Sequence, residues 1–257
     1  LWIYGIGPTQ SGKTVLAQVY LADRMTQDPG TVLYCLPDKI SGEKQFLEKV
    51  CSLVETSPTL QPYILEPRTQ SLTKGACHTS AMSVYGAWAH SPASLNSITC
   101  IGGILDEIRL MPKIIKGETN AIEYMEDGVG TYINSGRAKL LGITTPRDEN
   151  DLMYQQLKKP HTNIYCWMSI CPNCGRVQWI DIYKNFEFDG TLYHPIVKCL
   201  YCDSGRFSDS LEKRELNKNS LYVKEEDEGK YFEDLPEFEV EKHMVFRWSR
   251  ENSPFTT

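Results

Sequence analysis

Residues 5–14, GIGPTQSGKT, have the types and spacing of a phosphate-binding loop. The stretch satisfies G-x-x-x-x-G-K-[ST], the Walker A motif, in which backbone N–H groups surround phosphate oxygens. Gly7 permits a tight turn, and Gly12 lets the backbone approach a phosphate closely. Lys13 is placed to reach the β- and γ-phosphates, and Thr14 offers a hydroxyl to Mg²⁺. The motif predicts a nucleotide site made by Gly7, Pro8, Thr9, Gln10, Ser11, Gly12, Lys13 and Thr14.

Two adjacent acids supply the carboxylates that hydrolysis of a bound nucleotide needs. The run ITCIGGILDE, residues 98–107, is typical of a buried parallel strand that ends in Asp106 and Glu107, a Walker B pattern. Ligands of doubly wound sheets lie outside the carboxyl ends of such strands. We expect Asp106 to hold Mg²⁺ together with Thr14. We expect Glu107 to orient and deprotonate the attacking water, while Lys13 stabilises charge on the phosphates. The structural alternative is an acidic N-cap after a core strand.

A third predicted strand ends in the hydroxyl pair Thr144 and Thr145. Such hydroxyls can contact the γ-phosphate or the attacking water and relay the loss of that phosphate. Thr-Thr-Pro is also a common way to leave a strand, so this alternative stays open.

Fast turnover requires an arginine that neutralises the transition state. The candidates are Arg109, Arg137, Arg147 or a residue from a neighbouring subunit.

Four of the nine cysteines form two C-x-x-C pairs, CPNCG at 171–175 and CLYC at 199–202. Each pair offers two thiolates, and the two pairs complete the closed tetrahedral geometry of structural zinc. Such a zinc ion stabilises folding and does no chemistry. The expected zinc ligands are Cys171, Cys174, Cys199 and Cys202. The other five cysteines lie in apolar contexts and are expected to be small core residues.

Composition and charge narrow the possible partners. The chain has 257 residues, of which 41% are hydrophobic and 23% charged, and no apolar run approaches the ~20 residues that span a bilayer. The net charge of −6 argues against a surface that grips many phosphates of duplex DNA, so any contact with DNA must be local. The chain shows no secretion signal, and we expect it to begin inside a longer gene product and to work in a reducing compartment.

The distribution of apolar residues predicts an α/β fold. Short apolar runs at 1–6, 31–36, 97–105 and 138–144 alternate with helical patterns at 13–25, 43–54 and 121–133. This alternation predicts a mainly parallel sheet flanked by helices. Together with the Walker A and Walker B motifs, it leads us to expect a P-loop NTPase fold of the RecA-like (ASCE) type. We expect an ATPase domain over 1–165, a zinc-ribbon-like insert over 166–207, and a C-terminal part over 208–257. In the last part we expect a helix near 208–216 and, after it, an acidic segment that forms a solvated face or a linker.

These elements, taken in order, resemble the ATPase portion of tailed-phage terminase large subunits of the lambda-like family. The resemblance extends from the phosphate-binding loop to beyond the zinc ribbon. It also rests on SPASLNSITCIGGILDE (91–107), on GRAKLLGITTP (136–146) and on the CPNCG that follows. The closing SPFTT, residues 253–257, is similar to the family's segment that leads towards its nuclease half.

The resemblance implies a motor that hydrolyses ATP with Mg²⁺ to translocate double-stranded DNA into a viral procapsid. Its implied partners are DNA, the portal protein and the small terminase subunit, in the cytoplasm of the infected host cell. The resemblance implies a homo-oligomeric ring for the working motor. For the isolated domain, a monomer is also compatible with it. No membrane contact and no nuclease activity are expected from this chain. The family's loop functions carry over to Gly7, Gly12, Lys13 and Thr14, its acids to Asp106 and Glu107, and its coupling position to Thr144 and Thr145.

Two departures from the family pattern concern charge. The acidic motif continues as DEIR, so Arg109 stands where a carboxylate is expected. The loop has Gln10 and lacks the basic residue that many terminases place early in it, which puts an arginine finger from the same subunit in doubt.

Two other functions are compatible with these motifs. A helicase or another DNA-remodelling ATPase is the alternative enzyme, and a nucleotide-gated zinc-ribbon scaffold is the alternative binding module. Glu107 argues against the scaffold, because a switch without turnover has less use for a water-activating carboxylate.

Overall fold

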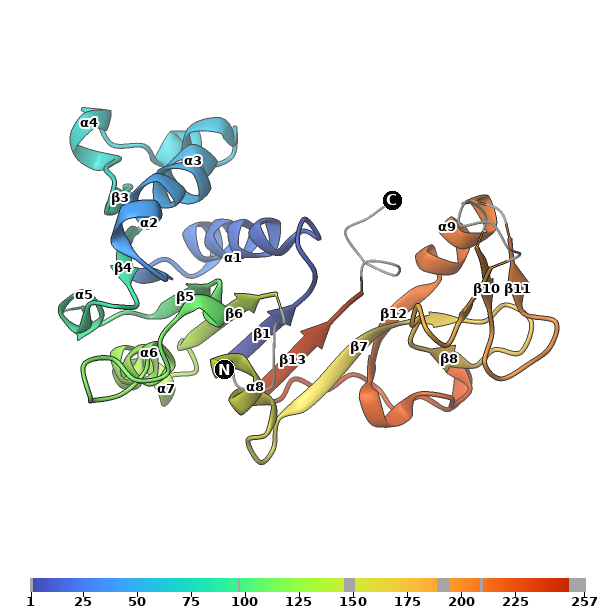
Figure 1. Ribbon diagram of the computed structural model, residues 1–257. Coiled ribbons are helices and arrows are strands. Elements are labelled where there is room, and N and C mark those ends of the chain that lie inside the picture. Colours follow the sequence, from blue (N-terminus) through green and yellow to red (C-terminus); the bar gives the residue numbers. More distant parts are fainter. Residues whose placement is uncertain (1, 97, 146–150, 189–194, 209, 250–257) are drawn as a thin grey trace. The chain divides into compact units, whose positions relative to one another are not determined.

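The computed structural model describes residues 2–96, 98–145, 151–188, 195–208 and 210–249 (Figure 1). Its internal contacts divide the chain into two compact units. The first contains residues 1–5 and 13–160, and the second contains residues 6–12 and 161–257. The arginine-finger candidate Arg147 and the SPFTT segment lie outside the described residues.

The first unit is built on a mainly parallel sheet, which confirms the predicted fold class. Its strands are β1 (Trp2–Ile6), β2 (Val32–Leu36), β3 (Ala76–His78), β4 (Ser83–Trp88), β5 (Gly102–Asp106) and β6 (Lys139–Thr144). Their order across the sheet is β1-β6-β5-β2-β4-β3. Strand β2 runs parallel to β4 and β5, and β5 runs parallel to β6, whereas β3 is antiparallel to β4. Parallel pairing brings the carboxyl ends of these strands to one edge of the sheet.

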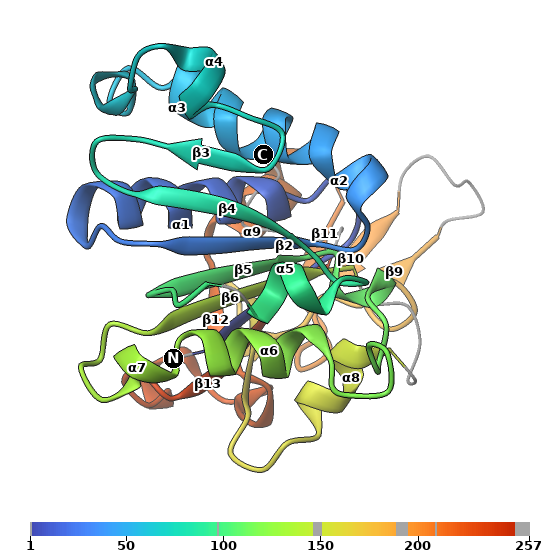
Figure 2. The same cartoon turned by 90° about the vertical axis from the view of Figure 1, so that its left-hand side faces the viewer.

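Helices cover both faces of this sheet. They are α1 (Lys13–Gln27), α2 (Lys39–Phe46), the π-helix η1 (Leu47–Cys51), α3 (Ser52–Thr56), α4 (Arg68–Ser71), α5 (Pro92–Asn96), the 3₁₀ turn η3 (Ile108–Leu110), α6 (Ala121–Gly128), α7 (Gly130–Ile133) and α8 (Leu152–Leu157). A Cβ on Gly102 would meet Tyr20 of α1, whereas one on Gly103 would meet Met125 of α6. Because successive side chains of a strand point to opposite faces, α1 and α6 lie on opposite faces (Figure 2).

The buried side chain of Arg24 orients helix α1 on the sheet. Its guanidinium donates to the backbone carbonyls of Ile101 (3.2 Å) and Arg137 (2.6 Å), which lie just before β5 and β6 begin, and it pairs with Asp28. Lys13 lies eleven residues earlier on the helix, about 16 Å along its axis at 1.5 Å per residue. Helix α1 therefore carries Lys13 towards the edge where the parallel strands end.

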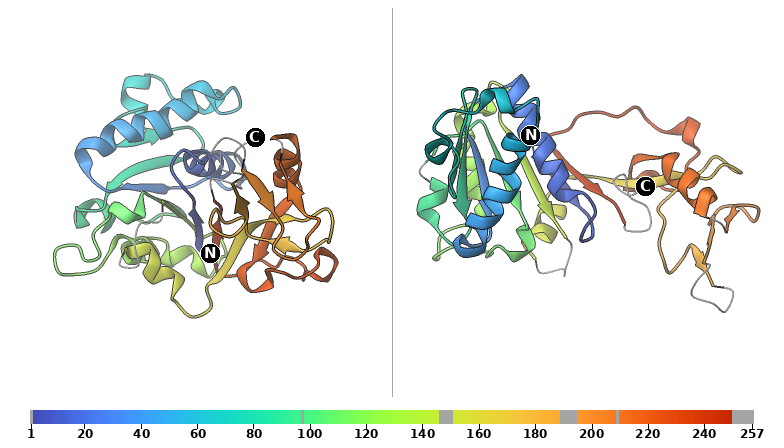
Figure 3. Two further views of the ribbon diagram at one scale, coloured as in Figure 1. Left: turned by 45° about the vertical axis from the view of Figure 1, so that its right-hand side comes forward. Right: turned by 90° about the horizontal axis from the view of Figure 1, so that it is seen from above.

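The second unit is centred on β7 (Asn163–Ile170). This strand is antiparallel to β8 (Val177–Gln178) and β12 (Ser220–Lys224), and parallel to β13 (His243–Arg247). A separate antiparallel sheet has the order β11-β10-β9, formed by β9 (Phe186–Glu187), β10 (Ile196–Lys198) and β11 (Arg206–Phe207). Helix α9 (Ser210–Lys218) follows, near its predicted position, and is coloured orange with the small sheet in Figure 3.

The acidic segment of the second unit is mostly solvated, yet it is anchored at several points. Most side chains of residues 231–240 are exposed. The ring of Phe238 nevertheless packs against Tyr165 with centroids 5.2 Å apart, and Glu241 pairs with Lys224 at 2.9 Å. Strand β7 runs across the predicted boundary at 165/166, and the division of the chain into three functional parts at 165/166 and 207/208 remains a prediction. Within the described ranges, no helix combines the length and the apolar character that a membrane crossing requires.

Candidate functional site

The loop from Ile6 to Gly12, the predicted phosphate-binding loop, contains two residues with left-handed backbone. Gln10 and Gly12 adopt positive φ angles of 57° and 85°, a region that favours glycine. Inside the loop the Ser11 hydroxyl donates to the carbonyl of Pro8 at 2.6 Å. The side chains of Thr9 and Gln10 are exposed. Gly7 is not among the residues with a positive φ, so its lack of a side chain has another cause.

Lys13, the first residue of α1, is 8% exposed. Burial lowers the pKa of its ammonium group, because removal from water disfavours the charged form. The carboxylates of Glu107 and Asp106 oppose this effect, and the cations of Arg109 and Lys49 add to it. The predicted catalytic residues Lys13, Asp106 and Glu107 are therefore close enough to act on one another electrostatically. Thr14 follows as the second residue of α1 and is partly exposed.

Asp106 is the last residue of β5 and is 3% exposed. Its Oδ2 accepts a hydrogen bond from the Tyr34 hydroxyl at 2.8 Å and one from Lys49 Nζ at 2.6 Å. Tyr34 lies on β2, the neighbour of β5, and burial followed by the nearby Asp106 charge raises its pKa well above the usual value. A buried carboxylate needs such partners, because an unpaired buried charge is costly. The region around Asp106 thus already accommodates a cation.

Sequence reasoning missed both partners of Asp106. Lys49 lies in the π-helix η1, a single wide turn within an otherwise α-helical run from residue 39 to residue 56, and π-turns are frequent at functional sites. Its spacing in the sequence gives no signal of this contact. Tyr34 offered a weak signal, since it places a hydroxyl in a strand that is buried at every position. A buried hydroxyl needs a polar partner.

Glu107 leaves the strand with a left-handed backbone, φ 59° and ψ 49°. This conformation is uncommon for a residue other than glycine, and such strain clusters at functional sites. It turns the Glu107 side chain away from the direction that a continued strand would give it. The Glu107 carboxylate lies 3.3 Å from Arg109 Nε, an ion pair in which both side chains are partly buried. Asp106 thus ends the strand, whereas Glu107 lies in the left-handed turn that follows it.

Thr144 ends β6 beside this turn and is fully buried. The register of the two strands pairs Asp106 with Ile143, so Thr144 is the next residue along the neighbouring strand. Its hydroxyl accepts a hydrogen bond from the backbone N–H of Arg109 at 3.1 Å. The Thr145 hydroxyl is buried and makes no hydrogen bond within the described part of the chain. The structure therefore brings Thr144 to the acidic turn, as its predicted role requires.

The arginine candidates lie in different places. Arg109 lies beside Glu107 at the carboxyl end of the sheet. Arg137 precedes β6, at the edge where the strands begin, and its side chain pairs with Asp28 at 2.7 Å. Arg137 is thus at the opposite edge of the sheet from Asp106 and Glu107.

The four predicted zinc ligands form one cluster, the sole such group among the described residues. The Sγ atoms of Cys171, Cys174, Cys199 and Cys202 all lie within 4.8 Å of one another. Two Sγ pairs are 3.9 Å and 3.8 Å apart. Thiolates at ~2.3 Å from a tetrahedral zinc ion are about 3.8 Å apart, so the donor set and spacing fit zinc. The other five cysteines are buried, as expected.

Gly205 lies against this cysteine cluster. A Cβ at this position would be 2.5 Å from Cys199 Cβ and 3.0 Å from Cys171 Sγ. Gly175, directly after the first cysteine pair, has a positive φ of 70°. Glycines at these two places let the backbone fold closely around the four sulfur atoms.

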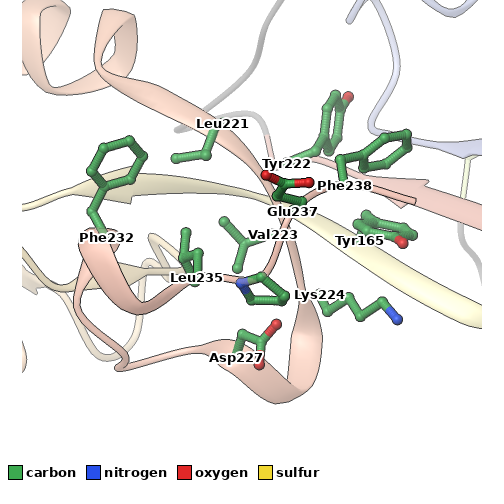
Figure 4. A pocket seen from close by; sticks show the side chains of 11 residues that line it. Tyr165, Leu221, Tyr222, Val223, Lys224, Asp227, Phe232, Leu235, Glu237 and Phe238 are labelled. Atoms are coloured by element: carbon green, nitrogen blue, oxygen red, sulfur yellow. The ribbon is translucent and has the colours of Figure 1, made fainter. Parts of the chain in front are cut away.

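A cavity of about 250 Å³ in the second unit lies where the acidic segment packs on β12. Figure 4 shows Phe232 on one side of it and the rings of Tyr165 and Phe238 on the other. The lysine in its wall, Lys224, pairs with Glu241 at 2.9 Å, and two further carboxylates line it. This donor set does not suit phosphate, which needs cations and N–H donors.

Comparison with known proteins identifies the family. A family model described as "Phage terminase large subunit gpA, ATPase domain" matches residues 3–214. No curated protein matches the chain. Among solved structures, the large terminase ATPase domain of Thermus phage P74-26 and a mutant of it align with TM-scores of 0.40 and 17% identity. Each alignment covers 60% of this chain and 63% of the other. Because the family model spans most of its length, the chain belongs to the family of phage terminase large subunit gpA ATPase domains.

Proposed function

We propose that this chain is the ATP-hydrolysing motor of a viral packaging enzyme, which translocates double-stranded DNA into a procapsid. The observation that carries the proposal is the charge cluster of Lys13, Asp106 and Glu107 where β5 ends. A lysine that follows the loop directly and lies near two adjacent carboxylates suits phosphoryl transfer to water. Family membership supports the same activity.

The nucleotide would be held by the loop Gly7–Gly12 and by the first residues of α1. Backbone N–H groups at a helix N-terminus favour an anion, and Lys13 adds a positive charge. Thr14 and Asp106 would hold Mg²⁺, whose charge supports the β- and γ-phosphate oxygens when it is bound. The Asp106 carboxylate fits this role because the structure already places a cation, Lys49 Nζ, 2.6 Å from it.

Glu107 would orient and deprotonate the attacking water. The Glu107–Arg109 ion pair would restrict the carboxylate, and the left-handed turn at Glu107 carries it out of the strand that ends in Asp106. Arg109 is the candidate arginine that the described part of the chain places at this edge, and a neighbouring subunit remains the other source. Thr144 and Thr145 would pass loss of the γ-phosphate to the rest of the chain, because Thr144 is bonded to the turn that carries Glu107.

The cysteine cluster would hold one structural zinc ion, which would stabilise the fold of the second unit. The proposed partners are double-stranded DNA, the portal protein and the small terminase subunit, with the motor working as a homo-oligomeric ring in the cytoplasm of the infected host cell. We propose no nuclease role and no membrane contact for this chain. The net charge of −6 fits a local DNA contact that is released in every cycle.

The decisive experiment measures steady-state ATP hydrolysis, with and without duplex DNA, for the wild type and Glu107→Gln. Removal of a general base should lower kcat by about 10²-fold or more while ATP still binds. Glu48→Gln is the matched control, because Glu48 is exposed on the helical run and pairs only with Lys44 among the described ion pairs. Lys13→Ala should weaken ATP binding as well as turnover. Unchanged hydrolysis by Glu107→Gln would refute the base assignment, and a wild type that binds no ATP would refute the proposed function.

A further inference from the structure

A tryptophan from the far end of the chain contacts both ends of the phosphate-binding loop. Trp248 follows β13 and is 3% exposed. Its backbone N–H donates to the carbonyl of Ile6 at 3.1 Å, where the loop begins. Its indole Nε1–H donates to the carbonyl of Ser11 at 3.2 Å, where the loop ends, and this bond is buried. All of these residues belong to the second unit.

The indole ring also explains Gly7. A Cβ on Gly7 would lie 2.2 Å from Cε2, 2.4 Å from Nε1 and 2.5 Å from Cζ2 of Trp248. Real Cβ atoms do not approach ring atoms so closely, and the buried ring has little room to move. Since Gly7 has no positive φ, the close approach of Trp248, rather than a turn, requires glycine at this position.

The hydrogen bond to Ser11 fixes the orientation of a peptide unit that the loop uses. The Ser11 carbonyl and the Gly12 N–H belong to one planar trans peptide and point in opposite directions. Because the carbonyl points at the indole, the Gly12 N–H points away from it. Gly12, which follows this peptide, has a positive φ of 85°, and glycine restricts the rotation of a neighbouring peptide least. Without a partner for the Ser11 carbonyl, this peptide can therefore rotate, and the Gly12 N–H then no longer points in one fixed direction.

We propose that Trp248 is a positioning residue of the nucleotide site, which holds the Ser11–Gly12 peptide so that the Gly12 N–H faces the phosphates. This inference rests on the proposed function. It also ties the end of strand β13 to the conformation of the nucleotide-binding loop. Nucleotide binding therefore changes the surroundings of Trp248, and a change at Trp248 alters nucleotide affinity.

The first test compares Trp248→Phe with Trp167→Phe. Both substitutions keep an aromatic ring and remove one indole hydrogen bond of 3.2 Å, from Ser11 in one case and from Asn217 in the other. Trp167 lies on β7 and does not belong to the loop. Trp248→Phe should weaken binding of Mg-ADP, measured by calorimetry, by about tenfold, the effect of one hydrogen bond. Trp167→Phe should leave that affinity unchanged, although both variants lose a similar amount of thermal stability.

The second test observes the wild type and uses variants only to assign resonances. The chain is labelled with 5-fluorotryptophan, and the ¹⁹F resonances of Trp248 and Trp167 are identified by their absence in folded Trp248→Phe and Trp167→Phe. Saturating Mg-ADP should shift the Trp248 resonance and leave that of Trp167 in place. An unmoved Trp248 resonance, or wild-type nucleotide affinity in Trp248→Phe, would overturn the positioning role and leave the proposed function intact. A wild type that binds neither ATP nor ADP would overturn both.

Discussion

The hydroxyl of Thr144 accepts a hydrogen bond from the backbone N–H of Arg109 at 3.1 Å. This bond joins the end of β6 to the turn that follows β5 and carries Glu107. The side chain of Thr144 is fully buried, so water cannot replace it. A displacement at either strand end is therefore transmitted to the other through a short, direct connection.

Thr144→Val removes this acceptor while it keeps the shape of the side chain. The Arg109 N–H then lacks its partner, and the turn that aims Glu107 loosens. A small displacement of a catalytic group costs up to about 10²-fold in rate, so we expect kcat for ATP to fall about 10- to 100-fold. The affinity for ATP should change little, because Thr144 supports the turn. Thr144→Ser retains the hydroxyl and serves as the control. Wild-type kcat in Thr144→Val would show that the bond has no catalytic consequence.

Lys49→Met tests the cation beside Asp106. The buried Asp106 carboxylate loses its ion pair and keeps the Tyr34 hydroxyl, so the unfolding free energy should fall by about 1–3 kcal/mol without ligand. Mg-ADP should reduce this loss of unfolding free energy, because the bound metal supplies a positive charge near Asp106. Lys44→Met, at a lysine that is 81% exposed, is the control and should change stability by less than about 0.5 kcal/mol. An equal loss with and without Mg-ADP contradicts the assignment of Asp106 to the metal.

Gly205→Ala tests the fit of the cysteine cluster around zinc. The new Cβ would meet Cys199 Cβ at 2.5 Å and Cys171 Sγ at 3.0 Å, so the four sulfur atoms cannot keep their spacing. We expect about one zinc per wild-type chain, and faster zinc release to a chelator from the variant. Gly130→Ala is the control, because no atom lies within 4 Å of a Cβ there. A fully folded wild-type chain without zinc would refute the structural metal.

A double-mutant cycle tests why residue 7 is glycine. Gly7→Ala places a methyl group into the Trp248 ring, so it should destabilise the chain by several kcal/mol, as severe overpacking does. If the ring is the cause, most of this cost should disappear in a Trp248→Ala background, where the methyl group has room. Thermal unfolding of the four chains gives the coupling free energy. Additive effects of the two substitutions would mean that Gly7 serves the backbone turn, as the motif alone suggests.

Local features of the chain made much of the fold predictable. Apolar periodicity, which depends on near neighbours, predicts the strands at 2–6, 32–36, 102–106 and 139–144. It also predicts the helix at 13–27 and a helical stretch at 121–133, which the structure divides into helices at 121–128 and 130–133. Strand β4 was not predicted. Its run SVYGAW contains Gly86, and glycine weakens a strand pattern because it contributes no side chain to pack. The sheet accepts it because Val84, Ala87 and Trp88 are buried in the core.

The sequence by itself determined the loop, the acidic pair and the four cysteines, because each of these is a set of residue types at fixed, short spacing. The tertiary structure alone decided that Lys49 and Tyr34 contact Asp106, that Thr144 bonds to the Glu107 turn, and that Trp248 packs on Gly7. These contacts join residues 35 to 241 positions apart along the chain. Such pairs arise from the packing of whole helices and strands, and no local pattern of residues specifies them.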